Sequence, residues 1–124
     1  MQPRVPSPID ALAVRAWTLT CAAGEGRGAL LAALRDGRSA LTANDFGAAP
    51  LPTFIGRVAG LEQRPLPDAL QRWECRNNRL AWLALNQDGF VDAARAAVER
   101  FGATRVAVII GTSTSSIGAS EEAY

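Results

Sequence analysis

Apolar residues along this chain lie either in short, nearly continuous runs, which predict strands, or at helical spacing, which predicts helices. Residues 11–20 (ALAVRAWTLT) are rich in apolar, β-branched and aromatic types, which favour a mostly buried strand. Leu30, Leu31 and Leu34 then follow at helical spacing, and Gly37 is typical of a helix C-terminus. The first third of the chain is therefore predicted to form a strand, a glycine-rich loop and a helix.

The middle of the chain passes from an irregular connection to a long helical pattern. A polar, proline-containing connection over residues 39–52 leads to a short predicted strand at 53–59. Apolar residues then recur at helical spacing from about residue 68 to residue 101. Asp88 and Gly89 are predicted to break or bend this helix, because glycine in a helix interior costs about 1 kcal/mol relative to alanine.

The clearest strand signal lies toward the C-terminal end. Residues 105–110 (RVAVII) form a continuous apolar run after one arginine, which predicts burial on both faces, as in a parallel sheet covered by helices. A turn at 111–116 and the start of a helix at 117–124 follow, whereas residues 1–8 hold three prolines and form an irregular lead-in. Strands that alternate with helices predict one α/β domain over residues 1–124, with a layered αβα arrangement and a mostly parallel sheet.

The amino-acid composition excludes several classes of catalytic and metal-binding site. Of the 124 residues, 13 are basic, and all of these are arginine, because the chain contains neither lysine nor histidine. Triads that depend on imidazole, histidine-ligated zinc, the P-loop lysine and Schiff-base lysines are thereby excluded within these residues. A formal net charge of +1 argues against non-specific nucleic-acid binding. We therefore expect any catalysis to use other groups or residues outside this sequence.

The spacing of the cysteines and the length of the apolar runs indicate in which cellular compartment the protein is expected. Cys21 and Cys75 lie far apart without CxxC spacing, so we expect neither a disulfide scaffold nor a metal cluster, and a reduced, cytoplasmic protein. The proline-rich N-terminus is unlike a signal peptide, and no apolar run approaches the roughly 20 residues that span a bilayer. We expect a soluble protein that contacts no membrane and binds no cofactor or metal.

Two glycine-containing turns come close to known motifs. Residues 24–29 (GEGRGA) fit the G-x-G-x-x-A fingerprint of dinucleotide sites, with Asp45 where a ribose-binding acid is sought. Residues 21–23 separate the first glycine from the predicted strand, so a structural glycine loop is the alternative. Residues 111–115 (GTSTS) approach the nucleophile elbow, but a serine replaces the second glycine and no histidine activates Ser113. Hydroxyl groups that cap the next helix are the simpler interpretation.

The region around residue 75 leaves alternatives open. Cys75 precedes an arginine near a predicted helix start, which fits either a reactive thiol or a small, half-buried side chain. Residues 76–79 (RNNR) fit either a solvated asparagine cap or a polar surface that orders a neighbouring subunit or loop. Trp17, Trp73 and Trp82 share no periodic stripe with basic residues, so core or interface positions are favoured over base stacking.

Three stretches, taken in order, carry a resemblance to a known family. Residues 30–41 (LLAALRDGRSAL) look like a helix that ends in G-[RK]-S-[GA]-[IL], and residues 54–58 (FIGRV) look like a short strand of the same family. Residues 105–117 (RVAVIIGTSTSSI), with Glu121 and Glu122, look like its strand, small-residue turn and following helix. Together they resemble the N-terminal part of the β-ketoacyl-[acyl-carrier-protein] synthases, and they imply part of the thiolase-like fold of those condensing enzymes.

The resemblance implies a catalytic role for a longer protein. Family members transfer an acyl chain from acyl carrier protein to a cysteine, and condense it with malonyl-carrier protein by decarboxylation. That cysteine and two histidines correspond to positions beyond residue 124, so no catalytic residue is expected here and this chain alone is expected to be inactive. By the same match, Thr112, Ser113 and Thr114 line or gate the acyl pocket near the dimer interface.

The resemblance also implies partners. They are acyl carrier protein and a second subunit, either an identical copy or a related synthase. The RNNR segment and the Thr-Ser-Thr turn look like the synthases of aryl-polyene-type pathways, in which a cysteine-lacking chain-length factor pairs with the synthase. A chain-length factor and a small dinucleotide-binding module are therefore the alternative functions. A sheet that stops after three strands leaves strand edges uncovered, which predicts self-association of the chain alone.

Overall fold

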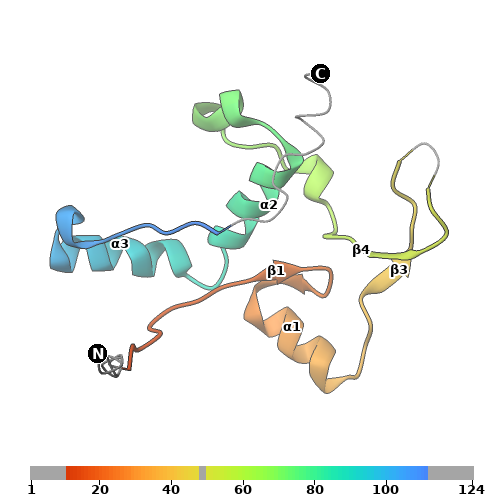
Figure 1. The fold of residues 1–124 in the computed structure, drawn as a ribbon, viewed down its shortest axis with the longest axis horizontal. Helices are drawn as coiled ribbons and strands as arrows, with labels where there is room; N and C mark the ends of the chain where they lie inside the picture. The colour runs from red at the N-terminus through yellow and green to blue at the C-terminus, as the bar shows by residue number, and fades with distance from the viewer. Residues whose placement is uncertain (1–10, 48–49, 112–124) are drawn as a thin grey trace, which may run out of the picture.

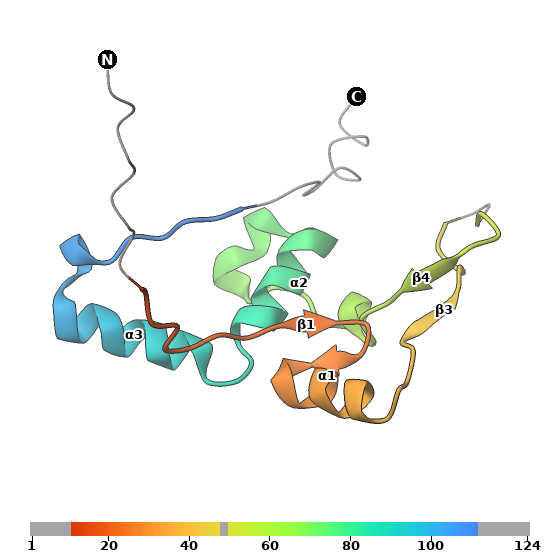
Figure 2. The ribbon, with the colours of Figure 1, turned by 60° about the horizontal axis from the view of Figure 1, so that its bottom comes forward.

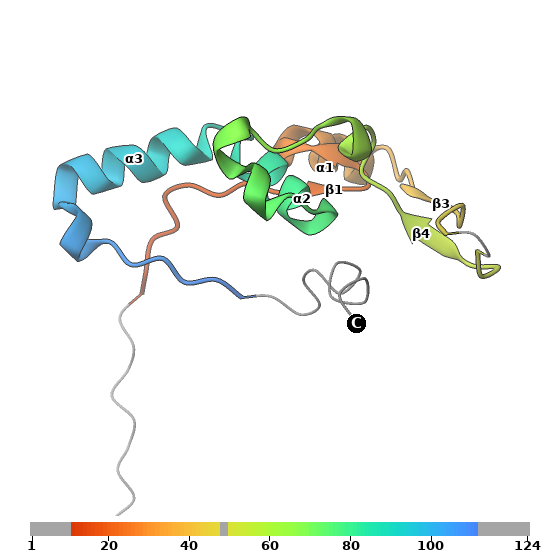
Figure 3. The ribbon, with the colours of Figure 1, turned by 90° about the horizontal axis from the view of Figure 1, so that it is seen from above.

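The computed structural model describes residues 11–47 and 50–111, in which helices supply most of the regular structure (Figure 1). The elements in chain order are β1 (Thr20–Cys21), β2 (Gly24–Glu25), α1 (Gly26–Arg35), β3 (Leu41–Ala43), β4 (Phe54–Gly56), the 3₁₀ helices η1 (Leu61–Gln63) and η2 (Asp68–Trp73), α2 (Arg76–Leu85), α3 (Phe90–Phe101) and the 3₁₀ helix η3 (Ala103–Arg105). Figures 2 and 3 show α3 at one end, the β3–β4 hairpin at the other, and α1 and α2 between them.

Both sheets of the described residues are two-stranded and antiparallel. β1 pairs with β2, and β3 pairs with β4 so that Leu41 lies opposite Gly56 and Ala43 opposite Phe54. The predicted mostly parallel sheet, the layered αβα arrangement and the partial thiolase-like fold are therefore wrong for this structure. β1 and β2 are joined by a two-residue turn, which only antiparallel strands allow, whereas parallel pairing needs a long crossover.

Two of the three predicted strands fail for the same reason. Residues 11–19 carry no regular structure, and only Thr20 of the predicted strand joins a ladder. Val106 has an extended backbone, but residues 106–110 belong to no strand of the described chain, and Ile109 is 93% exposed. The predicted burial of 105–110 on both faces is therefore wrong. Apolar and β-branched residues favour an extended backbone, but a strand forms only where a partner supplies the ladder. The strand predicted at 53–59 is confirmed in shortened form as β4.

The first predicted helix is confirmed, and its end follows from the sequence. Gly37 has a φ of +60°, which only glycine adopts without a steric penalty. The N–H of Gly37 donates to the carbonyl of Leu34, and the N–H of Arg38 donates to the carbonyl of Ala33 at 2.9 Å. This pair of bonds is the Schellman arrangement, which satisfies carbonyls left open at the end of α1.

The long helical pattern from residue 68 to residue 101 is divided into η2, α2 and α3. The break at Asp88 and Gly89 is confirmed, since both residues have left-handed backbones, with φ of +55° and +70°. The division between η2 and α2 at Glu74 and Cys75 was not predicted, because no glycine or proline marks it. Tertiary contacts at Glu74, described below, account for it.

The core is small. Only four apolar side chains of the described residues are buried, namely those of Ala33, Val58, Leu61 and Leu66, and Leu61 alone is fully buried. They come from α1, the loop after β4, η1 and the loop before η2, and η1 packs against α2. α3 contributes no buried residue. Within the described ranges, no helix is both long and apolar enough to span a bilayer.

Candidate functional site

The glycine loop forms a tight hairpin that delivers the chain into α1. β1 and β2 are joined by a two-residue turn, and the N–H of Gly26 donates to the carbonyl of Leu19 at 2.9 Å. Gly24 has a φ of +135°, and a Cβ there would lie 2.7 Å from the Cβ of Ala29. Gly26 has a φ of +77°. Both glycines are therefore required by backbone conformation and close packing.

The carboxylate of Asp88 occupies the N-terminus of α1. The backbone N–H of Arg27 donates to Oδ2 of Asp88 at 3.0 Å and to Oδ1 at 3.3 Å, and the Thr18 hydroxyl donates to Oδ2 at 3.0 Å. The Arg27 guanidinium lies 3.4 Å from the same carboxylate. Gly26 permits this approach, because a Cβ at that position would lie 3.2 Å from Oδ1. The contact joins the α2–α3 junction to the start of α1, across 61 residues of sequence.

The electrostatics of Asp88 follow from these contacts. Desolvation alone raises the pKa of Asp88, but the hydrogen bonds from the Arg27 N–H and the Thr18 hydroxyl outweigh it, so its pKa lies below the ordinary value. The carboxylate is therefore ionised at neutral pH. It places a negative charge at the positive end of the helix dipole, where such a charge is stabilising.

This arrangement argues against a dinucleotide site. A pyrophosphate bound by the G-x-G-x-x-A fingerprint accepts hydrogen bonds from the first N–H groups of the helix. Here Asp88 accepts the N–H of Arg27, and its negative charge repels a second anion. Asp45 lies in an ion pair with Arg57, at 2.8 Å between Oδ1 and Nη1, and not beside the glycine loop. The geometry favours the structural-loop interpretation of residues 24–29.

A second polar contact lies beside the first. The carboxylate of Glu25 is 2.5 Å from Nη1 of Arg64 and accepts a hydrogen bond from the Gln87 amide at 3.3 Å. Glu25 thus joins β2 both to the loop before η2 and to the end of α2. The sequence motif around the glycines contained Glu25, but nothing local identified its two distant partners.

The RNNR segment orders a loop of its own chain. Nε of Arg76 lies 3.0 Å from Oε1 of Glu62, and Nη1 of Arg79 donates to the Glu62 carbonyl at 2.7 Å. Arg79 also pairs with Glu74, whose other oxygen accepts the backbone N–H of Leu66. The bond from Arg76 lowers the pKa of Glu62, and the bonds from the Leu66 N–H and Arg79 lower that of Glu74. The two arginines therefore hold η1 and η2 against α2.

The asparagines do not cap α2. Its N-cap residue is Cys75, without a side-chain capping bond, and the Asn78 amide donates back to the Trp73 carbonyl at 2.7 Å. The solvated-cap interpretation is therefore wrong. Cys21 and Cys75 are both half-buried and neither is in a disulfide. No group of three or more cysteines and carboxylates within residues 11–47 and 50–111 is arranged to hold a metal ion.

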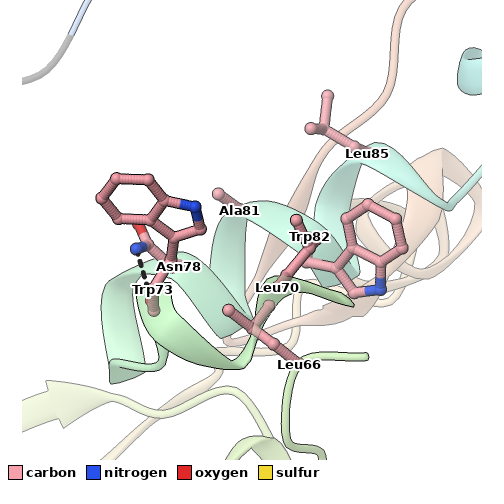
Figure 4. A pocket seen from close by; sticks show the side chains of 7 residues that line it. All are labelled: Leu66, Leu70, Trp73, Asn78, Ala81, Trp82 and Leu85. Carbon is pink, nitrogen blue, oxygen red and sulfur yellow. Dashed lines mark hydrogen bonds between the residues drawn. The ribbon is translucent and has the colours of Figure 1, made fainter. Parts of the chain in front are cut away.

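Two tryptophans flank an apolar groove of about 260 Å³ between η2 and α2. Figure 4 shows its lining side chains, which are those of Leu66, Leu70, Trp73, Asn78, Ala81, Trp82 and Leu85. The Trp73 and Trp82 residues are 55% and 40% exposed, and Arg72 lies 4.5 Å above the Trp73 ring. Neither tryptophan lies in the core, so of the two predicted positions, core or interface, the core is excluded for both. The groove is an apolar surface feature.

The remaining predicted site residues fall elsewhere. Thr112, Ser113 and Thr114 lie outside the described residues, which end at Gly111. No protein-family model matches the sequence, and neither a curated protein nor a solved structure is similar enough to match. The cytoplasmic location and the catalytic family therefore stay predictions from the sequence.

Proposed function

We propose that this chain is the N-terminal segment of a β-ketoacyl-[acyl-carrier-protein] synthase and contributes binding surface, not catalytic groups, to that enzyme. The observation that carries the proposal is the ordered match of residues 30–41, 54–58 and 105–117 to stretches of this family. The proposal concerns the activity and not the family's sheet, which the two antiparallel hairpins contradict.

The surface of the described residues supports a segment that packs against further polypeptide. Four buried apolar side chains are few for the described ranges 11–47 and 50–111, and large apolar residues remain exposed on several elements there. In the described residues many charged groups pair with one another in surface ion pairs. The contacts described thus serve structure and association.

The proposed reaction assigns the chemistry to residues beyond Tyr124. A cysteine thiolate takes the acyl group from one carrier protein, with release of that carrier's thiol. Malonyl-carrier protein then loses CO₂, and its α-carbon attacks the enzyme thioester, which frees the cysteine and leaves a β-ketoacyl chain two carbons longer. Thr112, Ser113 and Thr114 are proposed to line the pocket that receives the acyl chain.

The experiment is to read the coding sequence past Tyr124 and to purify the longer product. Incubated with acyl- and malonyl-carrier proteins, it is expected to release CO₂ and to form a β-ketoacyl-carrier protein, while the 124-residue chain alone forms none. A longer protein that has the cysteine but transfers no acyl group would overturn the proposal. A longer protein without the cysteine, active only beside a second synthase, would instead identify the chain-length factor.

The pocket assignment has its own test in the longer protein. Thr114→Phe is expected to shorten the acyl chains that are accepted, because the larger ring fills pocket volume, whereas Thr114→Ser keeps the length unchanged. The product lengths are measured by mass spectrometry of the carrier-bound chains. An unchanged product distribution in Thr114→Phe would remove Thr114 from the pocket.

A further inference from the structure

A hollow of about 440 Å³ lies between α3 and the segment that leads to β1. Its lining residues are Arg15 of that segment and Ala96, Ala97, Arg100 and Phe101 of α3. Figures 2 and 3 show the segment passing beside α3. Small-molecule sites usually have volumes of about 300–1,000 Å³, so the hollow is large enough for a small ligand.

Helical spacing accounts for the shape of the hollow. Residues four apart on a helix share a face, so Ala96 lies one turn before Arg100, and Ala97 lies one turn before Phe101. Long side chains on a helix point back toward its N-terminus and cover the preceding turn. Here that turn carries two alanines, whose small side chains leave space beneath the two long ones.

The hollow carries two positive charges that no carboxylate of the described residues neutralises. Neither Arg15 nor Arg100 takes part in an ion pair or a side-chain hydrogen bond between described residues. The nearby carboxylates of α3 are placed elsewhere, since Asp92 pairs with Arg95 at 3.6 Å and Glu99 lines a different groove. The C-terminus of α3 contributes about half a negative charge, so the hollow keeps a net charge of about +1.5.

Phe101 supplies an aromatic surface beside these charges. The residue is 54% exposed, and the guanidinium carbon of Arg100 lies 5.1 Å from the centroid of its ring. A guanidinium group can stack on an aromatic ring and still donate its N–H groups to an anion. A ligand that joins a ring to an oxyanion can therefore contact Phe101 and both arginines.

We propose that this hollow binds a small phosphate monoester that carries an aromatic or heteroaromatic ring. A phosphate monoester has a charge of about −1.5 to −2 at pH 7, which matches the charge of the hollow better than a carboxylate does. Its oxygens accept N–H groups from Arg15 and Arg100, and its ring packs against Phe101. Because both arginines are exposed, we expect a dissociation constant of about 0.1–1 mM.

The inference does not rest on the proposed function. Its test measures ligand binding by the 124-residue chain, whereas the test of the proposed function measures condensation by a longer protein. Failure of one therefore leaves the other standing.

NMR titration of the isotope-labelled chain at constant ionic strength measures the binding. Phenyl phosphate is expected to shift the amide signals of Arg15 and of residues 96–101. Inorganic phosphate, which lacks the ring, is expected to bind at least about threefold more weakly, and phenol, which lacks the charge, is expected not to bind. Adenosine monophosphate is the second ring-bearing probe, and the tighter of the two probes identifies whether the hollow takes a simple arene or a nucleobase. No shift at these residues up to about 10 mM phenyl phosphate, or equal binding of either control ligand, would overturn the proposal.

Charge-matched variants test the site itself. Arg15→Gln and Arg100→Gln are each expected to weaken the binding of phenyl phosphate at least about fivefold, because each removes a charge-assisted contact. Arg95→Gln is the matched control, since it removes the same charge from α3 but lies outside the hollow and pairs with Asp92, and it is expected to change the binding less than about twofold. Equal losses in Arg95→Gln and Arg100→Gln would show general charge attraction and would exclude the site.

Phe101→Leu tests the role of the ring. Leucine keeps an apolar surface without the aromatic face, so the preference for phenyl phosphate over inorganic phosphate is expected to fall while the binding of inorganic phosphate stays unchanged. Far-UV circular dichroism checks that each variant keeps its helix content. An unchanged preference in a folded Phe101→Leu chain would contradict the proposed ring contact.

Discussion

Replacing Leu61 with alanine tests where the described residues obtain their stability. Leu61 is the first residue of η1 and the single fully buried side chain among them. Gly60, just before it, has a φ of +68°, and Arg76 and Arg79 hold the carboxylate and the carbonyl of Glu62, just after it. The backbone on both sides of Leu61 is thus fixed, so the surroundings cannot easily close over a smaller side chain.

The magnitude follows from the atoms removed. Leucine to alanine deletes three buried carbon atoms, which at about 0.8 kcal/mol each contribute about 2.4 kcal/mol to the free energy of unfolding. A residual cavity adds to this loss, and the total is expected to reach about 3–5 kcal/mol. Typical domains are stable by about 5–15 kcal/mol, and four buried apolar side chains in the described residues favour a value toward the lower end. Leu61→Ala is therefore expected to remove a large part of the stability.

Urea unfolding followed by far-UV circular dichroism measures the effect. The matched control is Leu51→Ala, because Leu51 is 73% exposed, and its free energy of unfolding is expected to change by less than about 0.5 kcal/mol. Both variants are compared at one protein concentration, so that self-association does not enter the difference. Equal losses in the two variants would refute the reasoning that the core lies around η1.

Two further predictions concern the start of α1. Gly26→Ala is expected to lower the free energy of unfolding by about 1–2 kcal/mol, since φ is +77° and the new Cβ crowds Asp88. Gly28→Ala is the control, because nothing lies within 4 Å of its new Cβ, and it is expected to raise the free energy of unfolding by about 0.5 kcal/mol. Melting temperatures of the two variants that shift in the same direction would contradict this prediction. Because the pKa of Asp88 is lowered in the folded chain, its contribution is complete above the unfolded pKa of about 3.9 and is lost as the pH falls through the folded pKa. Asp88→Asn is expected to flatten the acid limb of the melting temperature against pH, and an unchanged limb would refute the role of its charge.

Local signals in the sequence predicted local structure well. Gly37 ends α1 and Asp88-Gly89 separates α2 from α3, because each acts through its own backbone conformation. The boundary between η2 and α2 has no such signal. Glu74 accepts the N–H of Leu66 and pairs with Arg79, so the chain turns there for reasons that a helical pattern does not contain.

Neither the pairing of the strands nor the polar contacts between elements could be predicted from the sequence, because both join residues that lie far apart along the chain. Residues 11–20 and 105–110 have the composition of strands, yet composition does not state what a strand pairs with. Asp88 was predicted only as a helix break, although it binds the start of α1 across 61 residues. The sequence holds one local hint of this contact. Asp88 precedes a glycine at a position that favours a left-handed backbone, and such an aspartate is a candidate for a side-chain contact with a residue far away in sequence.

The balance between polar and apolar contacts in the described residues favours packing against further polypeptide. The elements are joined by arginine–carboxylate pairs such as Arg64 with Glu25 and Arg76 with Glu62, which are largely accessible to water. Exposed ion pairs contribute about 0–1 kcal/mol each, and less in high salt. Burying an aliphatic side chain contributes about 1.5–3 kcal/mol, but Val108, Ile109 and Ile110 remain in water. Covering these side chains therefore offers more stabilisation than any ion pair of the described chain.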